Sequence, residues 1–171
     1  MNFFELAKKR YSVRKFDSRP VEPELLDQIL EAGRIAPTAK NNQPQRIYVV
    51  KSEEGLQKID ALTPCRYGAP TVLIFAYSAA EEWKHPSEAG FRSGVEDVSI
   101  VASHVMLQAV DLGLGSVWIN LFSPAELKKT FSLPTDETPV LLLPVGYPAP
   151  DASPSPRHED RKPLSETVKE L

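Results

Sequence analysis

Apolar residues occur along the chain in two alternating patterns, one with helical spacing and one as short continuous runs. The helical spacing predicts five helices, over residues 3–10, from Pro23 to a stop at Pro37, and over residues 53–61, 95–112 and 123–131. The continuous runs predict four strands, at residues 47–50, 69–77, 116–119 and 138–148. Helices and strands therefore alternate through most of the chain.

Two of these elements indicate how the fold is layered. The segment 95–112 is apolar around most of its circumference, which is typical of a buried central helix. The run 69–77 is uniformly hydrophobic, as strands covered on both faces are. We therefore expect one α+β domain over residues 1–171, with three layers in the order α/β/α.

Two segments do not fit either pattern. Residues 78–93 are mixed in polarity and lack a clear period, which indicates a loop or lid. The segment 148–171 is rich in proline and polar residues at its start, which favours an extended C-terminal arm lying over another surface.

Composition narrows the classes of function. A chain of 171 residues with 42% hydrophobic and 25% charged positions suits one globular domain, and its net charge of -3 argues against a general nucleic-acid or membrane-surface binder. No apolar run approaches membrane-spanning length, and the N-terminus lacks the apolar region of a signal peptide. Cys65 is the only cysteine, so we expect no disulfide, a thiol that serves as a small core residue, and a cytoplasmic location.

The stretch RYSVRKFDS, residues 10–18, carries the most specific chemistry. Arg10, Ser12 and Arg14 share one face if the backbone is extended, and two guanidinium groups around a hydroxyl suit a phosphate group. The alternative is that Lys8, Lys9 and Arg10 only complement the negative end of the helix dipole.

Other motifs are less decisive. The sequence GLGS follows a helix and enters a strand, so its first glycine, Gly113, is explained as a helix cap, and no GxGxxG, GxxxxGK or HExxH motif is present. The three histidines are far apart in sequence. Asp97 is either an acid–base candidate or a partner of the helix dipole. The loop TAKNNQPQ groups amide side chains that could pair with the edge of a ring or could simply form turns.

Taken together, four stretches resemble the FMN-dependent nitroreductase family. They are RYSVRKF, the helix end EAGRIAP with TAKNNQPQ, the segment EDVSIVASHVMLQAVDLGLGSVWI, and VLLLPVGYP with the trailing HEDRKPLSETV. The resemblance implies a nitroreductase-like fold, in which a mostly antiparallel sheet surrounds the long buried helix, and a homodimer with FMN at its interface.

The resemblance also implies a role for individual residues. Arg10, Tyr11 and Ser12 would meet the phosphate and ribityl end of FMN, Arg14 the pyrimidine end, and Arg161 would return to the phosphate. Pro37, Thr38, Ala39 and Asn41 would pack on the flavin from the partner subunit, and Trp118, Ile119, Asn120 and Leu121 would approach its N5 and O4 edge. The chain departs from many relatives at Gln45, where they have tryptophan, and at Glu159 and Asp160, where basic residues are common.

The function implied is hydride transfer from NAD(P)H through FMN to a nitroaromatic, quinone or similar acceptor, in a ping-pong cycle without catalytic protein residues. No metal site is expected. Two alternatives stay open, namely an FMN-binding sensor or carrier without redox turnover and a flavin reductase whose substrate is not a nitro compound.

Overall fold

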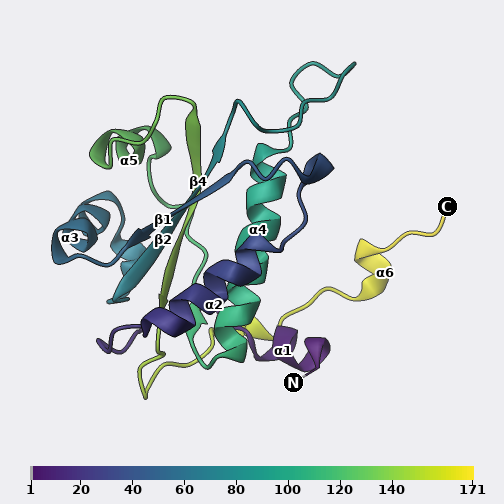
Figure 1. Cartoon of the computed structure of the whole chain (residues 1–171). Coiled ribbons are helices and arrows are strands. Elements are labelled where there is room, and N and C mark those ends of the chain that lie inside the picture. Colours follow the sequence, from purple (N-terminus) through teal and green to yellow (C-terminus); the bar gives the residue numbers. More distant parts are fainter. Residues whose placement is uncertain (1) are drawn as a thin grey trace.

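The computed structural model describes residues 2–171 as helices packed on both faces of one antiparallel sheet (Figure 1). The helices are α1 (Phe3–Lys9), α2 (Pro23–Arg34), α3 (Glu53–Leu62), α4 (Gly94–Asp111), α5 (Pro124–Thr130) and α6 (Leu164–Thr167). The strands are β1 (Gln45–Val50), β2 (Thr71–Ser78), β3 (Gly115–Ser116) and β4 (Glu137–Gly146). Short 3-10 turns lie at η1 (Ala39–Asn41), η2 (Pro64–Arg66) and η3 (Pro156–His158).

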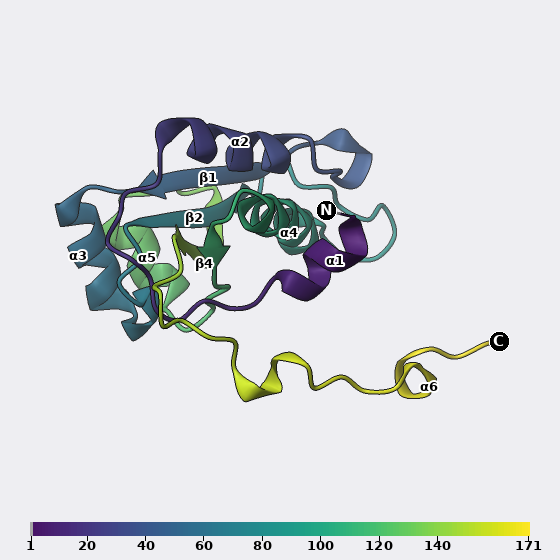
Figure 2. The ribbon, with the colours of Figure 1, turned by 90° about the horizontal axis from the view of Figure 1, so that it is seen from below.

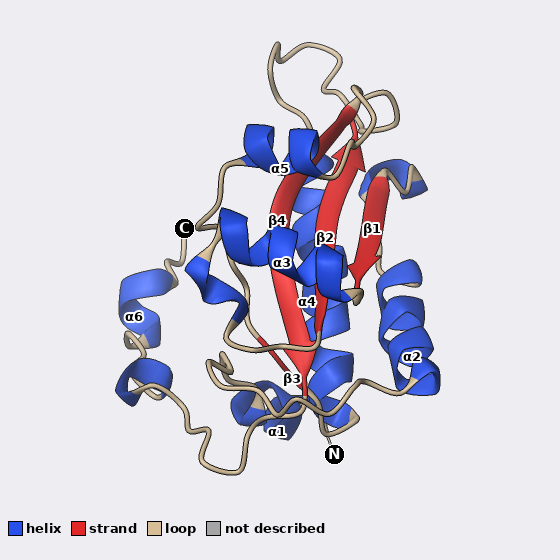
Figure 3. Cartoon of the chain, turned by 90° about the vertical axis from the view of Figure 1, so that its left-hand side faces the viewer, coloured by secondary structure: helices blue, strands red, loops and turns tan. Residues whose placement is uncertain are grey.

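The sheet has the order β1-β2-β4-β3, and every neighbouring pair is antiparallel. Side chains alternate across β2, so that Leu73 and Phe75 pack with α2 and α4, while Val72 and Ile74 pack with α3 and α5. Figure 3 shows α3 and α5 on the face of the sheet opposite α4. Burial on both faces explains the uniformly apolar run, and the predicted three-layer α+β fold is confirmed.

Local signals place most helix ends. Pro23 begins α2, and α4 is followed by Gly113, whose φ of 80° suits glycine, so both predictions are confirmed. The hydroxyl of Ser123 accepts a hydrogen bond from the amide of Glu126 at 3.3 Å, as expected of an N-cap.

The predicted strand at residues 116–119 is wrong in its extent. Only Gly115 and Ser116 form β3, while Ile119 makes an isolated bridge with Leu142. Between them, the amide of Val117 donates to the carbonyl of Pro144 at 3.3 Å. Proline has no amide hydrogen to return, so the ladder is interrupted at this point.

Residues 79–93 form an irregular loop with one isolated bridge, between Lys84 and Arg92. The C-terminal segment leaves β4, runs beside the N-terminal segment, and then extends away from the body of the domain (Figure 2). Within residues 2–171, no helix combines the length and apolarity needed to cross a membrane.

Candidate functional site: an arginine-lined pocket

The Arg10–Arg14 segment is extended and lies against β3. Ser12 bridges Ser116 in parallel, and the amide of Val13 donates to the carbonyl of Ser116 at 3.0 Å. Val13 is 1% exposed and belongs to the core, so the residues on either side of it face outward. Gly115 permits this approach, because a Cβ at that position would overlap the side chain of Val13.

The outward-facing row lines a cavity of about 400 Å³. Its lining consists of Arg10, Tyr11, Ser12, Arg14, Ser155, Arg157, His158 and Arg161. No carboxylate side chain lines this pocket, and none of its four arginines forms an ion pair anywhere in residues 2–171. Guanidinium groups gathered without a counter-charge fit a multiply charged anion such as a phosphate monoester.

The C-terminal arm brings its arginines to the pocket through contacts with the same chain. His158 donates its Nε2 hydrogen to the carbonyl of Lys8 at 3.2 Å, and its ring meets the ring of Tyr11 edge-on, with centroids 6.3 Å apart. These contacts place Arg157 and Arg161 beside the N-terminal row. The pocket is therefore assembled from the two ends of the sequence.

The pKa of Tyr67, a residue that interacts with Arg14 of the N-terminal row, is raised. A hydrogen bond with Cys65 and partial burial raise the pKa of Tyr67, while the positive charge of Arg14 opposes this shift. Cys65 is half-buried and packs against the core cluster under α3 and α5. Its role as a small packing residue agrees with the expectation from sequence.

The residues predicted to pack on a flavin from the partner subunit lie elsewhere. Pro37, Thr38, Ala39 and Asn41 follow α2 and do not line the arginine pocket. The amide of Ala39 donates to the carboxylate of Asp97 at 2.7 Å, which anchors this loop to the start of α4.

The segment from Trp118 to Leu121 lies beside β4 and also stays outside the pocket. Asn120 accepts a hydrogen bond from the Trp118 indole at 2.6 Å and donates to the carbonyl of Val140 at 2.9 Å, so its side chain is engaged within the protein. Ile119 is buried in the core, whereas Leu121 is 66% exposed. The single chain thus brings the N-terminal row, including Arg14, together with Arg161, whereas the other two predicted groups lie outside this pocket.

The model of the nitroreductase family matches residues 7–66 and 62–147, which is most of the chain. The chain belongs to the nitroreductase family. The family match covers the N-terminal row and ends where the C-terminal arm begins.

Individual members of the nitroreductase family are similar over nearly the full length. The crystal structure of a nitroreductase family protein from Clostridium difficile 630 superposes with a TM-score of 0.92 at 42% identity, covering 99% of this chain and 98% of that one. An NADH dehydrogenase/NAD(P)H nitroreductase from Methanothermobacter thermautotrophicus is 36% identical over 159 residues, which cover 87% of this chain and 78% of the relative. An FMN reductase [NAD(P)H] from Bacillus subtilis is 31% identical, over 85% of this chain and 66% of the relative.

Sequence reasoning missed three residues of the pocket in this nitroreductase-family chain, namely Ser155, Arg157 and His158. A signal for Arg157 was present, since RHEDR holds two arginines four positions apart. Arg157 also supplies a positive charge shortly before Glu159 and Asp160.

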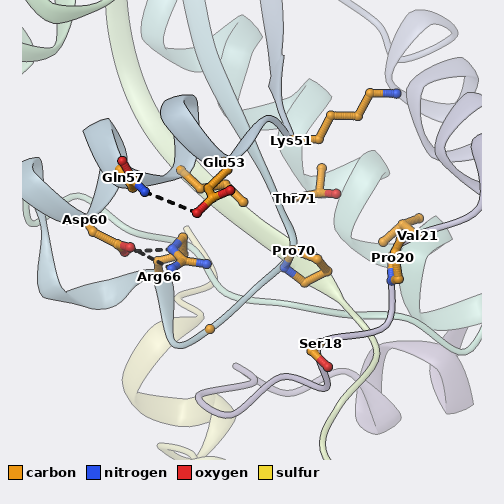
Figure 4. Close-up of a pocket in the computed structure, with 12 residues that line it drawn as sticks. Ser18, Pro20, Val21, Lys51, Glu53, Gln57, Asp60, Arg66, Pro70 and Thr71 are labelled. Atoms are coloured by element: carbon orange, nitrogen blue, oxygen red, sulfur yellow. Dashed lines mark hydrogen bonds and ion pairs between the residues drawn. The ribbon is translucent and has the colours of Figure 1, made fainter.

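A second cavity, of about 750 Å³, lies between α3 and the segment 18–21 (Figure 4). Its charges are balanced, because Lys51 and Arg66 line it together with Glu53 and Asp60. Two hydrogen bonds of 2.6 Å join Arg66 to Asp60. This cavity is larger than the arginine pocket, but its balanced charges make it less suited to an anion.

Proposed function

We propose that the protein is an FMN-dependent NAD(P)H oxidoreductase, and that the arginine pocket binds the phosphate of FMN. Membership of the nitroreductase family supports the oxidoreductase class, and the FMN reductase from Bacillus subtilis supports the cofactor. The observation that carries the proposal is the pocket with four arginines and no carboxylate lining.

In this proposal each chain segment has a binding role. Arg10, Ser12 and Arg161 hold the phosphate, Tyr11 borders it, and Arg14 stabilises negative charge at the pyrimidine end of the ring. When bound, FMN would supply the redox chemistry, accepting hydride from NAD(P)H and passing it to a nitroaromatic, quinone or similar acceptor. The protein itself has to bind, orient and leave one face of the ring accessible.

We also propose a two-fold homodimer in which the ring lies between subunits. Exposed apolar side chains support this proposal, because large apolar groups in contact with water favour association. Several of them lie on α1, at the start and middle of α4, and on the end of the arm, namely Phe3, Phe4, Val95, Ile100, Leu164 and Val168. The loop 37–41 lies outside the arginine pocket of its own chain. In the homodimer proposal it would contact the flavin ring from the second subunit instead.

The first experiment tests the cofactor. We expect the purified protein to be yellow, to release FMN on denaturation, and to bind FMN more tightly than riboflavin, which lacks the phosphate. FMN at a hundredfold excess over its dissociation constant should stabilise the fold by about 3 kcal/mol. Release of FAD, or a colourless protein that FMN does not stabilise, would refute the cofactor proposal.

The second experiment tests turnover. NADH and NADPH oxidation is followed with menadione, nitrofurazone and free flavin as acceptors. Turnover with menadione or nitrofurazone supports the proposal, and turnover with free flavin alone identifies a flavin reductase. Binding of FMN without any NAD(P)H oxidation would indicate a sensor or carrier.

A truncation tests the dimer and the arm together. Chains ending at Tyr147 lack Arg157 and Arg161, so we expect weaker FMN binding and weaker dimers in sedimentation. A truncated chain that stays dimeric and retains its FMN would contradict the role of the arm.

A further inference from the structure

A buried carboxylate outside the arginine pocket lies in the first turn of α4. Asp97 is 2% exposed, and its two oxygens have separate partners. Oδ1 accepts the amide hydrogen of Ala39 at 2.7 Å, and Oδ2 accepts the hydroxyl hydrogen of Ser93 at 2.7 Å. No lysine, arginine or histidine of residues 2–171 forms an ion pair with it. Both oxygens are therefore paired with donors, in the first turn of the helix, where acidic side chains are common.

The Oδ1 side of Asp97 holds a loop with unusual backbone geometry. Lys40, Asn41 and Gln43 have φ values of 52°, 56° and 53°, in the left-handed region that is unfavourable for residues other than glycine. Such a backbone persists only where surrounding contacts hold it. The hydrogen bond from Ala39 to Asp97 joins this loop to the first turn of α4.

The Oδ2 side of Asp97 closes the base of the loop formed by residues 79–93. The hydroxyl of Ser93 accepts the amide hydrogen of Trp83 at 3.0 Å, and the amide of Ser93 donates to the carbonyl of Trp83 at 3.0 Å. Above this closure the rings of Trp83, His85 and Phe91 pack edge-on, with centroids between 5.5 and 5.9 Å apart. The position of Ser93 therefore sets the position of a small aromatic cluster.

Asp97 thus joins two segments that are far apart in sequence, since Ala39 and Ser93 lie on opposite sides of two strands and a helix. The chain of hydrogen bonds runs from the Ala39 amide through Asp97 and Ser93 to the Trp83 amide. A further bond, from Asn42 Nδ2 to the carbonyl of Glu81 at 3.0 Å, joins the same segments directly. In Figure 1 both segments lie beside the same end of α4.

We infer that Asp97 is a positioning residue that fixes the loop 38–43 and the base of the loop 79–93 as one unit. The inference rests on the proposed function, because the loop 38–43 includes residues that we place at the flavin ring. The unit shares no residue with the arginine pocket. Asp97 therefore governs the geometry at the ring end and acts on reaction with the acceptor, whereas the pocket governs FMN affinity.

Hydrogen exchange tests the inference without any cofactor. Asp97→Ala should speed amide exchange about ten- to a hundredfold at Ala39, because it removes the bond from that amide to a carboxylate. Exchange at Trp83 should also speed up, because the Ser93 hydroxyl that accepts its amide hydrogen loses its partner. Glu96→Gln is the matched control, since it removes a negative charge from the adjacent, exposed position of the same helix and should leave both amides unchanged. Unchanged exchange at either amide in Asp97→Ala, or equal effects in Glu96→Gln, would overturn the inference.

A second variant serves if Asp97→Ala does not fold. Asp97→Asn keeps an acceptor for Ala39 but replaces the Oδ2 acceptor with an amide donor, which cannot accept the Ser93 hydroxyl hydrogen. We expect faster exchange at Trp83 with little change at Ala39. If both amides of Asp97→Asn exchanged as slowly as they do in the wild type, the relay through Ser93 would be contradicted.

Kinetics separates positioning from a general structural role. In folded Asp97→Ala the KM for the acceptor should rise several-fold, while the FMN dissociation constant stays within about twofold of wild type. If the KM for the acceptor and the FMN dissociation constant rose by the same factor, the positioning role would be overturned. A wild-type protein that binds no FMN would refute the proposed function instead, and the exchange result would still decide whether Asp97 couples the loops.

Discussion

The two arginines of the N-terminal row should have separable effects on a bound flavin. Arg10 is half-buried in the pocket and has no ion-pair partner within residues 2–171, so a bound phosphate would provide its main charge contact. A hydrogen bond to a charged group contributes about 1.5–3 kcal/mol. Arg10→Ala should therefore weaken FMN binding about ten- to a hundredfold. The midpoint potential should hardly move, because the phosphate charge is the same in both redox states.

Arg14 should behave in the opposite way. Its guanidinium is exposed and makes a 3.3 Å hydrogen bond to the carbonyl of Ser12, so it is held on the row but open to a ligand. Arg14 would favour the reduced ring, whose negative charge is greater near N1 and O2. Loss of a differential of about 1–2 kcal/mol in Arg14→Gln would lower the two-electron midpoint by about 20–45 mV.

Spectroelectrochemical titration, with FMN affinity measured by fluorescence, distinguishes the two arginines. Lys9→Ala is the matched control, because Lys9 is an exposed cation next to Arg10 that does not line the pocket. It should change neither quantity beyond a small effect of net charge, which salt screens. Equal midpoint shifts in both arginine variants, or a shift only in Arg10→Ala, would show that the row is placed wrongly on the cofactor.

Three further predictions concern the pocket and the fold around it. Gly115→Ala should destabilise the protein by about 1–3 kcal/mol and weaken FMN binding, because the added Cβ would push the N-terminal row away from β3. Chemical unfolding measures the loss of stability, and FMN titration measures the loss of affinity. Arg157→Gln should weaken FMN binding about tenfold in fluorescence titration and leave riboflavin binding unchanged, since Arg157 would act only on the phosphate. Burial, and secondly a hydrogen bond to Glu137, raises the pKa of Tyr48 to about 12, so the contribution of Tyr48 to the free energy of unfolding should be constant below about pH 10 and be lost between about pH 10 and 12. Chemical unfolding across this range should show a smaller fall in Tyr48→Phe than in the wild type.

The fold followed from sequence where local and tertiary preferences agree. The apolar run of β2 is buried on both faces, and the mostly apolar α4 is the central helix, so each pattern had one consistent interpretation. The short β3 could not be anticipated in the same way. Its length depends on which residue of β4 stands opposite, and the partner of Val117 is a proline that cannot complete the pairing.

The candidate site was predictable only in part, for a related reason. Alternation of side chains along an extended segment brought Arg10, Ser12 and Arg14 to one face, and this needs no knowledge of the rest of the chain. Arg157 and His158 come to the same pocket through the path of the C-terminal arm, which has no periodic pattern to read. The buried connection through Asp97 was equally hidden, because an acid in the first turn of a helix has an ordinary explanation in the helix dipole.

Because the pocket is built from both ends of the chain, an anion bound there would be coupled to the position of the arm. Four guanidinium groups line the pocket without a carboxylate among them, so repulsion between the arginines of the arm and those of the N-terminal row opposes docking, and Glu159 beside Arg161 offsets part of it. Backbone hydrogen bonds from Asp17 to Tyr147 at 2.9 Å and from Ala149 to Lys15 at 3.0 Å hold the start of the arm against this repulsion. A dianion in the pocket would convert the repulsion into attraction and stabilise the docked arm. By reciprocity, whatever holds the arm in place must raise the affinity for the anion by the same free energy.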